Sequence, residues 1–148
     1  MAEHKITLKW KRETETFTYD TYNRDHTWIF EGGSKVTASA APGYRGNPAL
    51  VNPEEAFVAA LSSCHMLTFL AVAAKRKFVV DTYSDHAVGF LEKNATGKPA
   101  VTRVILRPRM AFSGSTPTKE QLTALHEEAH RGCFIANSVT TEVTVEAG

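Results

Sequence analysis

The chain has 148 residues, of which 43% are hydrophobic and 22% are charged, so its length fits one domain and its composition is that of a folded globular protein. Seventeen Lys and Arg residues face sixteen Asp and Glu residues, leaving a formal net charge of +1, which gives no bulk positive field to favour nucleic acid or an anionic membrane. The first fifteen residues carry charges where a signal peptide needs an apolar core. We therefore expect a cytoplasmic protein whose two cysteines are free thiols.

Short alternating stretches predict an N-terminal antiparallel meander of three or four strands. Ile6, Leu8 and Trp10 alternate with polar residues, which is the period of a half-buried strand. Three later stretches are rich in β-branched or aromatic residues, and Gly32-Gly33 predicts a turn between the last two. The expected strands are residues 5–11, 16–20, 27–30 and 35–38.

A long helix is expected after the irregular segment 40–52. Asn52 suits the N-cap, Pro53 the first helical position and Glu54 the first turn, and Glu55 completes a capping pattern with Asn52. Residues 56–74 are mostly apolar, and the charges of Lys75-Arg76-Lys77 suit a helix C-terminus.

The apolar helix has two interpretations. Its length approaches the roughly 20 residues that span a bilayer, but its centre reads Ser-Ser-Cys-His, and the rest of the chain has the pattern of amphipathic strands that need a soluble core. A helix that is apolar on all sides is more simply a buried one. A single small domain cannot cover a helix about 35 Å long on every side, so we expect a second subunit to complete its burial.

The C-terminal half predicts two strands, a helix and a last strand. The strands are residues 78–93 and 101–112, joined by a turn-rich link over 94–99, and Pro108 places the second strand at an edge or a bulge. Thr116-Pro117 begins the second helix and Gly132 ends it. Residues 139–146 alternate as a final strand. This order of elements indicates the α+β class.

Several residue patterns could carry chemistry, and each also has an ordinary structural interpretation. Cys64 in an apolar helix could be a small buried hydrophobe, whereas Cys133 follows a helix end, where its sulfur could reach another group. The string HEEAH at 126–130 matches the two-histidine zinc pattern, but it lacks an evident third ligand and is expected to be a solvated helix face. The arginines of the 101–112 strand are expected to be solvated as well.

The motifs resemble those of the OsmC/Ohr family of osmotically inducible and organic-hydroperoxide-resistance proteins, which are thiol peroxidases. The similarity rests on the Asn-Pro-Glu helix start, the Ala-Leu-Ser-Ser-Cys-His segment ending at His65, and Ala129-His130-x-x-Cys133 followed by Asn137-Ser138. It covers most of the chain and implies the OsmC-like fold: N-terminal antiparallel strands, a long buried central helix, further strands, a second helix and an intertwined homodimer. His65 after Cys64 resembles the OsmC-like branch more than the Ohr branch.

The resemblance also implies roles for individual residues. Cys64 is similar to the peroxidatic thiol, Cys133 to the resolving thiol, and Glu54 to the acidic partner of a catalytic arginine. The family places that arginine in the N-terminal strands, where Arg24 is the best match and Arg45 the second choice. His26 and His65 receive no role, and no cofactor or metal is expected.

Physical chemistry constrains these roles. A peroxidatic cysteine reacts as a thiolate, but Cys64 lies about 15 Å from the helix N-terminus, too far for the helix dipole to stabilise the anion. A cation is therefore required, and Arg24 suits because a guanidinium stays charged. Glu54 also lies about 15 Å from Cys64 along a straight helix. A two-fold dimer would bring Glu54 and an arginine of one subunit to Cys64 of the other.

The expected reaction is reduction of a hydroperoxide by Cys64, followed by a Cys64–Cys133 disulfide that a dithiol of the lipoyl type reduces. Apolar residues around Cys64 favour an organic hydroperoxide over hydrogen peroxide. Two other interpretations remain open: a non-catalytic dimeric, stress-associated binding protein of the same fold, and a zinc hydrolase using HEEAH.

Overall fold

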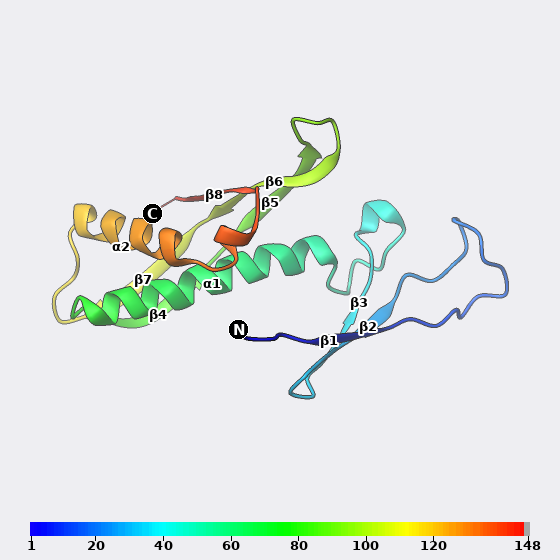
Figure 1. The fold of residues 1–148 in the computed structure, drawn as a ribbon, viewed down its shortest axis with the longest axis horizontal. Helices are drawn as coiled ribbons and strands as arrows, with labels where there is room; N and C mark the ends of the chain where they lie inside the picture. Colours follow the sequence, from blue (N-terminus) through cyan, green and yellow to red (C-terminus); the bar gives the residue numbers. More distant parts are fainter. Residues whose placement is uncertain (147–148) are drawn as a thin grey trace. The chain divides into compact units, whose positions relative to one another are not determined.

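The computed structural model describes residues 1–146, which form two compact units, Met1–Ala56 and a second unit beginning at Phe57. The order of elements is three strands, a long helix, four strands, a second helix and a last strand (Figure 1). The chain is therefore of the α+β class, as its sequence predicts. A single domain spanning residues 1–148 stays a prediction.

The N-terminal unit contains an antiparallel meander of three strands, β1 (Ile6–Lys9), β2 (His26–Phe30) and β3 (Lys35–Ala38). The register places Leu8 opposite Trp28, and Trp28 opposite Val36, so these apolar side chains share one face of the sheet. Gly33 takes a left-handed conformation with φ 97° in the turn before β3. The turn that Gly32-Gly33 predicts is confirmed.

The strand expected over residues 16–20 is wrong, because this stretch is a loop between β1 and β2. The hydroxyl of Thr21 lies within hydrogen-bond distance of the hydroxyls of Thr16 and Thr18 and also contacts their carbonyl groups. Threonine side chains that bond to nearby backbone offer the chain an alternative to a strand ladder. The first strand is also shorter than expected and ends at Lys9.

Helix α1 spans Pro53–Lys75 and begins as the sequence predicts. Asn52 and Glu55 form a reciprocal cap, in which the Glu55 amide donates to Asn52 Oδ1 at 2.9 Å and the Asn52 amide donates to Glu55 Oε1 at 3.1 Å. One side of the helix is buried within the chain. The buried residues are Leu61, His65, Phe69, Val72 and Ala73.

Each of the two long strands expected after α1 is divided in two, and the halves belong to different sheets. The first becomes β4 (Val79–Asp85) and β5 (Val88–Lys93), and the second becomes β6 (Pro99–Leu106) and β7 (Pro108–Ser113). β4 pairs with β7, whereas β5 pairs with β6. Pro108 has no amide hydrogen for a continuous ladder, and it lies opposite Asp85 at the point where the first pairing ends.

The second helix, α2, spans Lys119–Gly132 and not residues from Thr116 onward. Thr118 is its N-cap, because the Thr118 hydroxyl accepts from the Gln121 amide at 3.1 Å and Gln121 Oε1 accepts from the Thr118 amide. The last strand, β8, is also shorter than expected, spanning Glu142–Val145 and pairing parallel to β6.

Two apolar clusters hold the second unit together. In the first, Phe69 and Val72 of α1 pack with Leu125 and Ala129 of α2, and Figure 1 shows α2 lying along α1. In the second, Leu61 packs against the sheet that contains β5, β6 and β8. A Cβ at Gly89 of β5 would lie 2.5 Å from Val58 of α1, so this glycine permits a close approach of helix and strand. Both clusters are built on α1, so α1 is the central element of this unit.

Candidate functional site

The two cysteines come from different elements of the second unit and lie together. Cys64 is in the middle of α1 and is half-buried, and Cys133 follows the last residue of α2 and is buried, with 1% of its surface exposed. The two side chains are close enough for Cys64 to raise the pKa of the Cys133 thiol, and both are free thiols. Residues 69 positions apart in sequence thus meet at one place in the fold.

The environment of Cys133 favours its protonated form. Burial raises the pKa of the Cys133 thiol above its ordinary value, and the neighbouring Cys64 raises it further, while the Ala136 and Ile135 amides act in the opposite direction. The Ala136 amide donates to Cys133 Sγ at 3.4 Å, and the Asn137 amide donates to the Cys133 carbonyl at 3.0 Å. Cys133 is therefore a protonated, positioned thiol that can act as a donor toward Cys64.

A buried pair of histidines joins α1 to α2. His65 Nε2 is 3.0 Å from His126 Nδ1, and the two rings are stacked with centroids 5.3 Å apart. Burial lowers the pKa of each from 6.5 to about 4, and in His65 the neighbouring His126 lowers it further. At neutral pH both rings are therefore uncharged, and one proton joins the two nitrogens.

The remaining ring nitrogens of this pair, His65 Nδ1 and His126 Nε2, are buried and have no hydrogen-bond partner within residues 1–146. If His65 donates the shared hydrogen, then His126 Nε2 carries a hydrogen and His65 Nδ1 is a bare acceptor; the reverse holds in the other arrangement. Phe69 stacks on His126 with ring centroids 4.6 Å apart and closes one side of the pair.

The burial of His126 corrects the expectation that HEEAH is a solvated helix face. His126 is only 4% exposed, whereas Glu127 and His130 are exposed as expected. The described residues bring together no group of three or more His, Cys, Asp or Glu side chains that could hold a metal ion. The period of α2 could have indicated this position, because residue 126 lies one turn from both Leu122 and Ala129 on the apolar face.

Asp85 links α1 to the neighbouring strands through two hydrogen bonds. Its carboxylate accepts from Ser62 Oγ at 2.5 Å and from the Arg107 amide at 2.6 Å. Its negative charge acts in the opposite direction to burial on both histidines, raising their pKa. Neither Asp85 nor Ser62 was expected at the site, since nothing in their spacing indicates the break between β4 and β5 that places them together.

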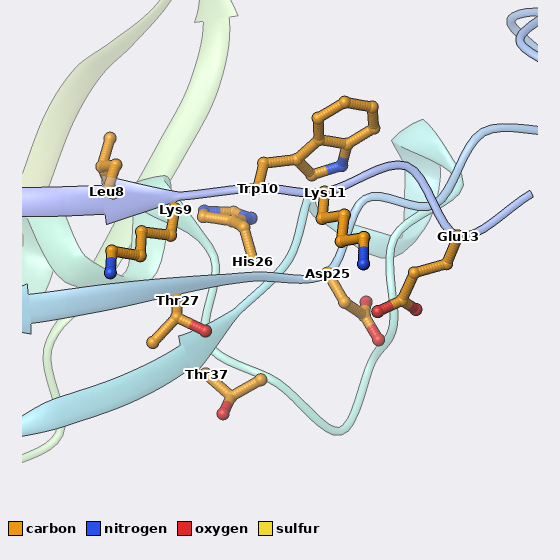
Figure 2. A pocket seen from close by; sticks show the side chains of 9 residues that line it. All are labelled: Leu8, Lys9, Trp10, Lys11, Glu13, Asp25, His26, Thr27 and Thr37. Carbon is orange, nitrogen blue, oxygen red and sulfur yellow. The ribbon is translucent and has the colours of Figure 1, made fainter.

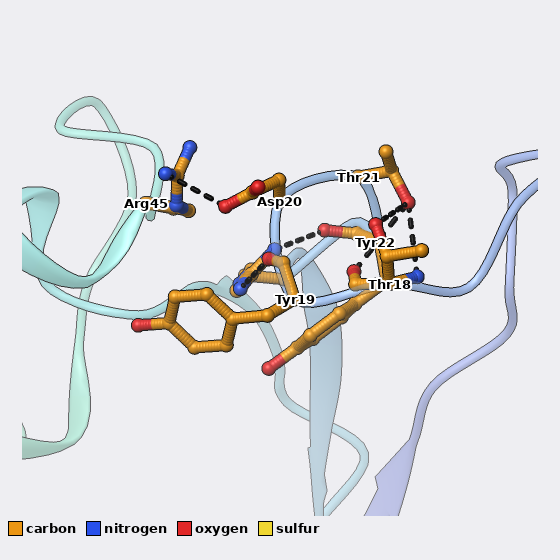
Figure 3. A network of polar contacts seen from close by, with 7 residues as sticks. Thr18, Tyr19, Asp20, Thr21, Tyr22 and Arg45 are labelled. Atoms are coloured by element: carbon orange, nitrogen blue, oxygen red, sulfur yellow. Dashed lines mark hydrogen bonds and ion pairs between the residues drawn. The ribbon is translucent and has the colours of Figure 1, made fainter.

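Arg24 is held within the loop between β1 and β2. Its guanidinium donates to the Tyr22 carbonyl at 2.5 Å and to the Tyr19 carbonyl at 2.6 Å, and it lies over the Tyr22 ring, 3.5 Å from the centroid. Figure 3 shows this loop, where Asp20 Oδ1 pairs at 2.8 Å with Nη2 of Arg45, a residue of the segment after β3. Arg24 thus organises its own loop, and a guanidinium has five N–H donors, of which two are used here.

His26 holds the backbone of Arg24. The indole of Trp28 donates to His26 Nε2 at 3.0 Å, and because indole is a donor only, the ring carries its hydrogen on Nδ1 and donates it to the Arg24 carbonyl at 2.7 Å. Figure 2 shows His26 beside Trp10 in an open hollow of about 630 Å³ on the N-terminal sheet. The sequence offered no role for His26, and the structure places it as a support for Arg24.

The predicted site residues are divided between the two units. The second unit contains Cys64 and Cys133, which the structure brings together. The N-terminal unit contains Arg24, Arg45 and Glu54, and Glu54 is half-buried in the first turn of α1. The arginines of the 101–112 region are exposed, as expected.

Comparison with known proteins gives the same family as the motifs. A model of the family described as OsmC-like protein matches residues 46–148, and no curated protein matches the chain. An OsmC-like protein of unknown function from Vibrio cholerae is 55% identical, with a TM-score of 0.96 and full coverage of both chains.

Two more distant structures share the fold. An organic hydroperoxide resistance protein from Legionella pneumophila has a TM-score of 0.72 at 17% identity, covering 99% of this chain and 96% of its own. The organic hydroperoxide resistance protein OhrB of Bacillus subtilis has a TM-score of 0.69 at 16% identity, covering 99% and 98%. Helix α1 has the length and hydropathy of a membrane span, but here it is the core helix of this fold. The chain belongs to the OsmC-like family.

Proposed function

We propose that this protein is a cysteine-based peroxidase that reduces organic hydroperoxides in defence against oxidative stress. The observation that carries the proposal is the close pair of free thiols, Cys64 and Cys133, in which Cys133 is buried with a raised pKa and Cys64 is half-buried. A half-buried nucleophile beside a protonated second thiol is the arrangement that a two-cysteine peroxidase requires. Membership of a family that includes hydroperoxide resistance proteins supports it.

The first step is attack of the Cys64 thiolate on the distal oxygen of the hydroperoxide. The O–O bond breaks, the alkoxide takes a proton and leaves as an alcohol, and Cys64 becomes a sulfenic acid. In the second step the Cys133 sulfur attacks the sulfenic sulfur, forming the Cys64–Cys133 disulfide and releasing water. A dithiol, which we propose to be of the lipoyl type, then reduces the disulfide and becomes a disulfide itself.

Arg24 and Glu54 complete the proposed site. A guanidinium would stabilise the Cys64 thiolate and the developing negative charge on the leaving oxygen, and a carboxylate would orient that guanidinium. We propose that a second copy of the chain supplies both groups. Arg45 is the alternative cation, and its ion pair with Asp20 is exposed to solvent.

A homodimer is supported by the exposed side of α1. Leu67 is 61% exposed, and the helix presents a row of small and apolar residues with a spacing of three or four. Helices pack closely along such rows. The row consists of Ala60, Ser63, Leu67, Ala71 and Ala74. Covering it with the same row of a second copy would remove apolar surface from water.

The apolar neighbours of Cys64 favour an organic substrate. Phe57, two turns before Cys64, and Met66, close after it, are half-buried, whereas Leu61 is fully buried in the core. Apolar side chains bind the carbon chain of an organic hydroperoxide and offer nothing to hydrogen peroxide. We propose a cytoplasmic enzyme, since two free thiols suit a reducing compartment.

Mass spectrometry after brief exposure of the reduced protein to one equivalent of cumene hydroperoxide tests the proposal. We expect wild type to lose two mass units as the disulfide forms, Cys133→Ser to gain one oxygen atom, and Cys64→Ser to remain unchanged. Slow or absent oxidation in all three proteins would exclude the peroxidase. The remaining function would then be a non-catalytic dimeric binding protein of the same fold.

A further inference from the structure

The last residue of α2, Gly132, lies against α1 at a point where no side chain fits comfortably. A Cβ added to Gly132 would be 3.2 Å from the Thr68 side-chain methyl, Cγ2, a distance that requires the neighbour to move by a few tenths of an ångström. The backbone does not require glycine here, because Gly132 is helical and is not among the residues with positive φ in the described chain. The close approach of the two helices is therefore the reason for a glycine.

This contact adjoins both thiols. Thr68 is one turn after Cys64, and its hydroxyl donates to the Cys64 carbonyl at 2.9 Å. Gly132 directly precedes Cys133, whose sulfur is held by the Ala136 amide. Displacing the end of α2 away from Thr68 would therefore carry Cys133 away from Cys64.

We propose that Gly132 is a positioning residue that lets α2 approach α1 closely enough for Cys133 to reach Cys64. The proposal rests on the proposed function for its consequence, which is the rate of the second step. In the disulfide the two sulfurs must come to about 2.05 Å, closer than two thiols that are not bonded to each other. Any atom between Thr68 and Gly132 opposes this last approach.

If Gly132 affected only the stability of α2, Gly132→Ala would not slow formation of the disulfide. Alanine is a better helix former than glycine within a helix, so Gly132→Ala should leave the stability of α2 equal or improved. A slower disulfide in a protein that is at least as stable would then report the approach of the two thiols.

A second substitution, at Thr68, can restore the space that a side chain at residue 132 would need. Thr68→Ser removes the Cγ2 methyl that the new Cβ would meet and keeps the hydroxyl that bonds to Cys64. The double variant Gly132→Ala/Thr68→Ser should therefore regain the wild-type geometry. Gly32→Ala is the control, because a Cβ at Gly32 meets no atom within 4 Å.

The experiment follows single turnover with cumene hydroperoxide by rapid quench and mass spectrometry, and measures the disulfide equilibrium in glutathione buffers. For Gly132→Ala we expect unchanged formation of the Cys64 sulfenic acid and a roughly three- to tenfold slower disulfide, since displacements below 1 Å already cost such factors. The disulfide equilibrium should fall by a similar factor. Thr68→Ser alone and Gly32→Ala should match wild type, and the double variant should recover.

A wild-type rate in Gly132→Ala would overturn the proposal, as would failure of Thr68→Ser to restore it. The absence of a Cys64–Cys133 disulfide in wild type under oxidised glutathione would overturn it as well. If wild type forms the disulfide with glutathione but ignores hydroperoxide, the peroxidase function fails. In that case the glutathione equilibrium of the variants still decides the role of Gly132.

Discussion

His65 of α1 and His126 of α2 share one hydrogen across 3.0 Å, in a site where both rings are almost fully buried. The pair bridges α1, which carries Cys64, and α2, which ends directly before Cys133. Because each ring is uncharged when folded and has a pKa near 6.5 when exposed, the pair links the stability of this region to pH.

Protonation of the pair should destabilise the fold in mild acid. Both pKa values fall from 6.5 to about 4 on folding, so between these values the unfolded chain binds more protons than the native protein. Stability is therefore complete above pH 6.5 and decreases as pH falls toward 4. Urea unfolding of wild type and His126→Gln at pH 7 and pH 5 should show a decrease smaller by about 1–2 kcal/mol in the variant.

The control for this experiment is His4→Gln, an exposed histidine of the N-terminal unit, because the charge of His130 itself lowers the pKa of His65. Its loss of stability between pH 7 and pH 5 should equal that of wild type. Equal pH dependence in His126→Gln and wild type would show that His126 is not held uncharged.

The two thiols should differ in their reactivity toward alkylating agents. Cys133 is 1% exposed and its pKa is raised, chiefly by burial, so little of it is thiolate at pH 7. We expect iodoacetamide to modify Cys64 at least about tenfold faster in the reduced native protein. Peptide mapping by mass spectrometry measures both rates, and in urea the difference should vanish. Faster modification of Cys133 would contradict the assigned roles.

The sequence predicts the helices and strands of this fold better than it predicts where each one begins and ends. The cap of α1 is visible because Asn52 and Glu55 have the spacing of a reciprocal hydrogen-bonded pair. The start of α2 is ambiguous, because Thr116 and Thr118 both precede apolar periodicity and only the geometry with Gln121 selects Thr118. The division of the long strands depends on pairing partners distant in sequence, which no local pattern records.

Of the candidate site, only the two thiols can be predicted from the sequence. Cys64 and Cys133 could be named from motif positions, but spacing does not reveal how α1 and α2 pack, including the close approach of Gly132 to Thr68. The His65–His126 pair and the Ser62–Asp85 bond likewise join residues more than 20 positions apart.

Removing the cap of α2 should lower stability. Thr118→Ala eliminates the hydroxyl that accepts from the Gln121 amide, and such losses cost about 1 kcal/mol. Thr116→Ala is the matched control and should change the free energy of unfolding by less than about 0.5 kcal/mol. Urea denaturation of the two variants distinguishes them, and a larger loss for Thr116→Ala would place the helix start where the sequence alone suggests it.

The bond between Ser62 and Asp85 should stabilise the second unit. Ser62→Ala leaves the Asp85 carboxylate without one of its two donors, which we expect to cost about 1–3 kcal/mol because the acceptor is charged and half-buried. Ser115→Ala, at an exposed position outside the proposed dimer interface, should have almost no effect. Thermal unfolding of both variants measures the difference, and equal midpoints would show that the bond contributes nothing.

Arg24 provides the last test, because it could act on Cys64 or only order its own loop. Lysine keeps the charge but lacks the planar fork that bonds two carbonyls and lies over Tyr22. If Arg24 stabilises the reacting thiolate, Arg24→Lys should slow oxidation of Cys64 by cumene hydroperoxide roughly ten- to hundredfold. Tyr22→Leu, which removes the ring and keeps the arginine, should have a much smaller effect, and Arg45→Lys should resemble wild type. Equal losses in Arg24→Lys and Tyr22→Leu would instead assign Arg24 to the ordering of the loop, because both changes disturb the same stacked contact while only one removes the guanidinium.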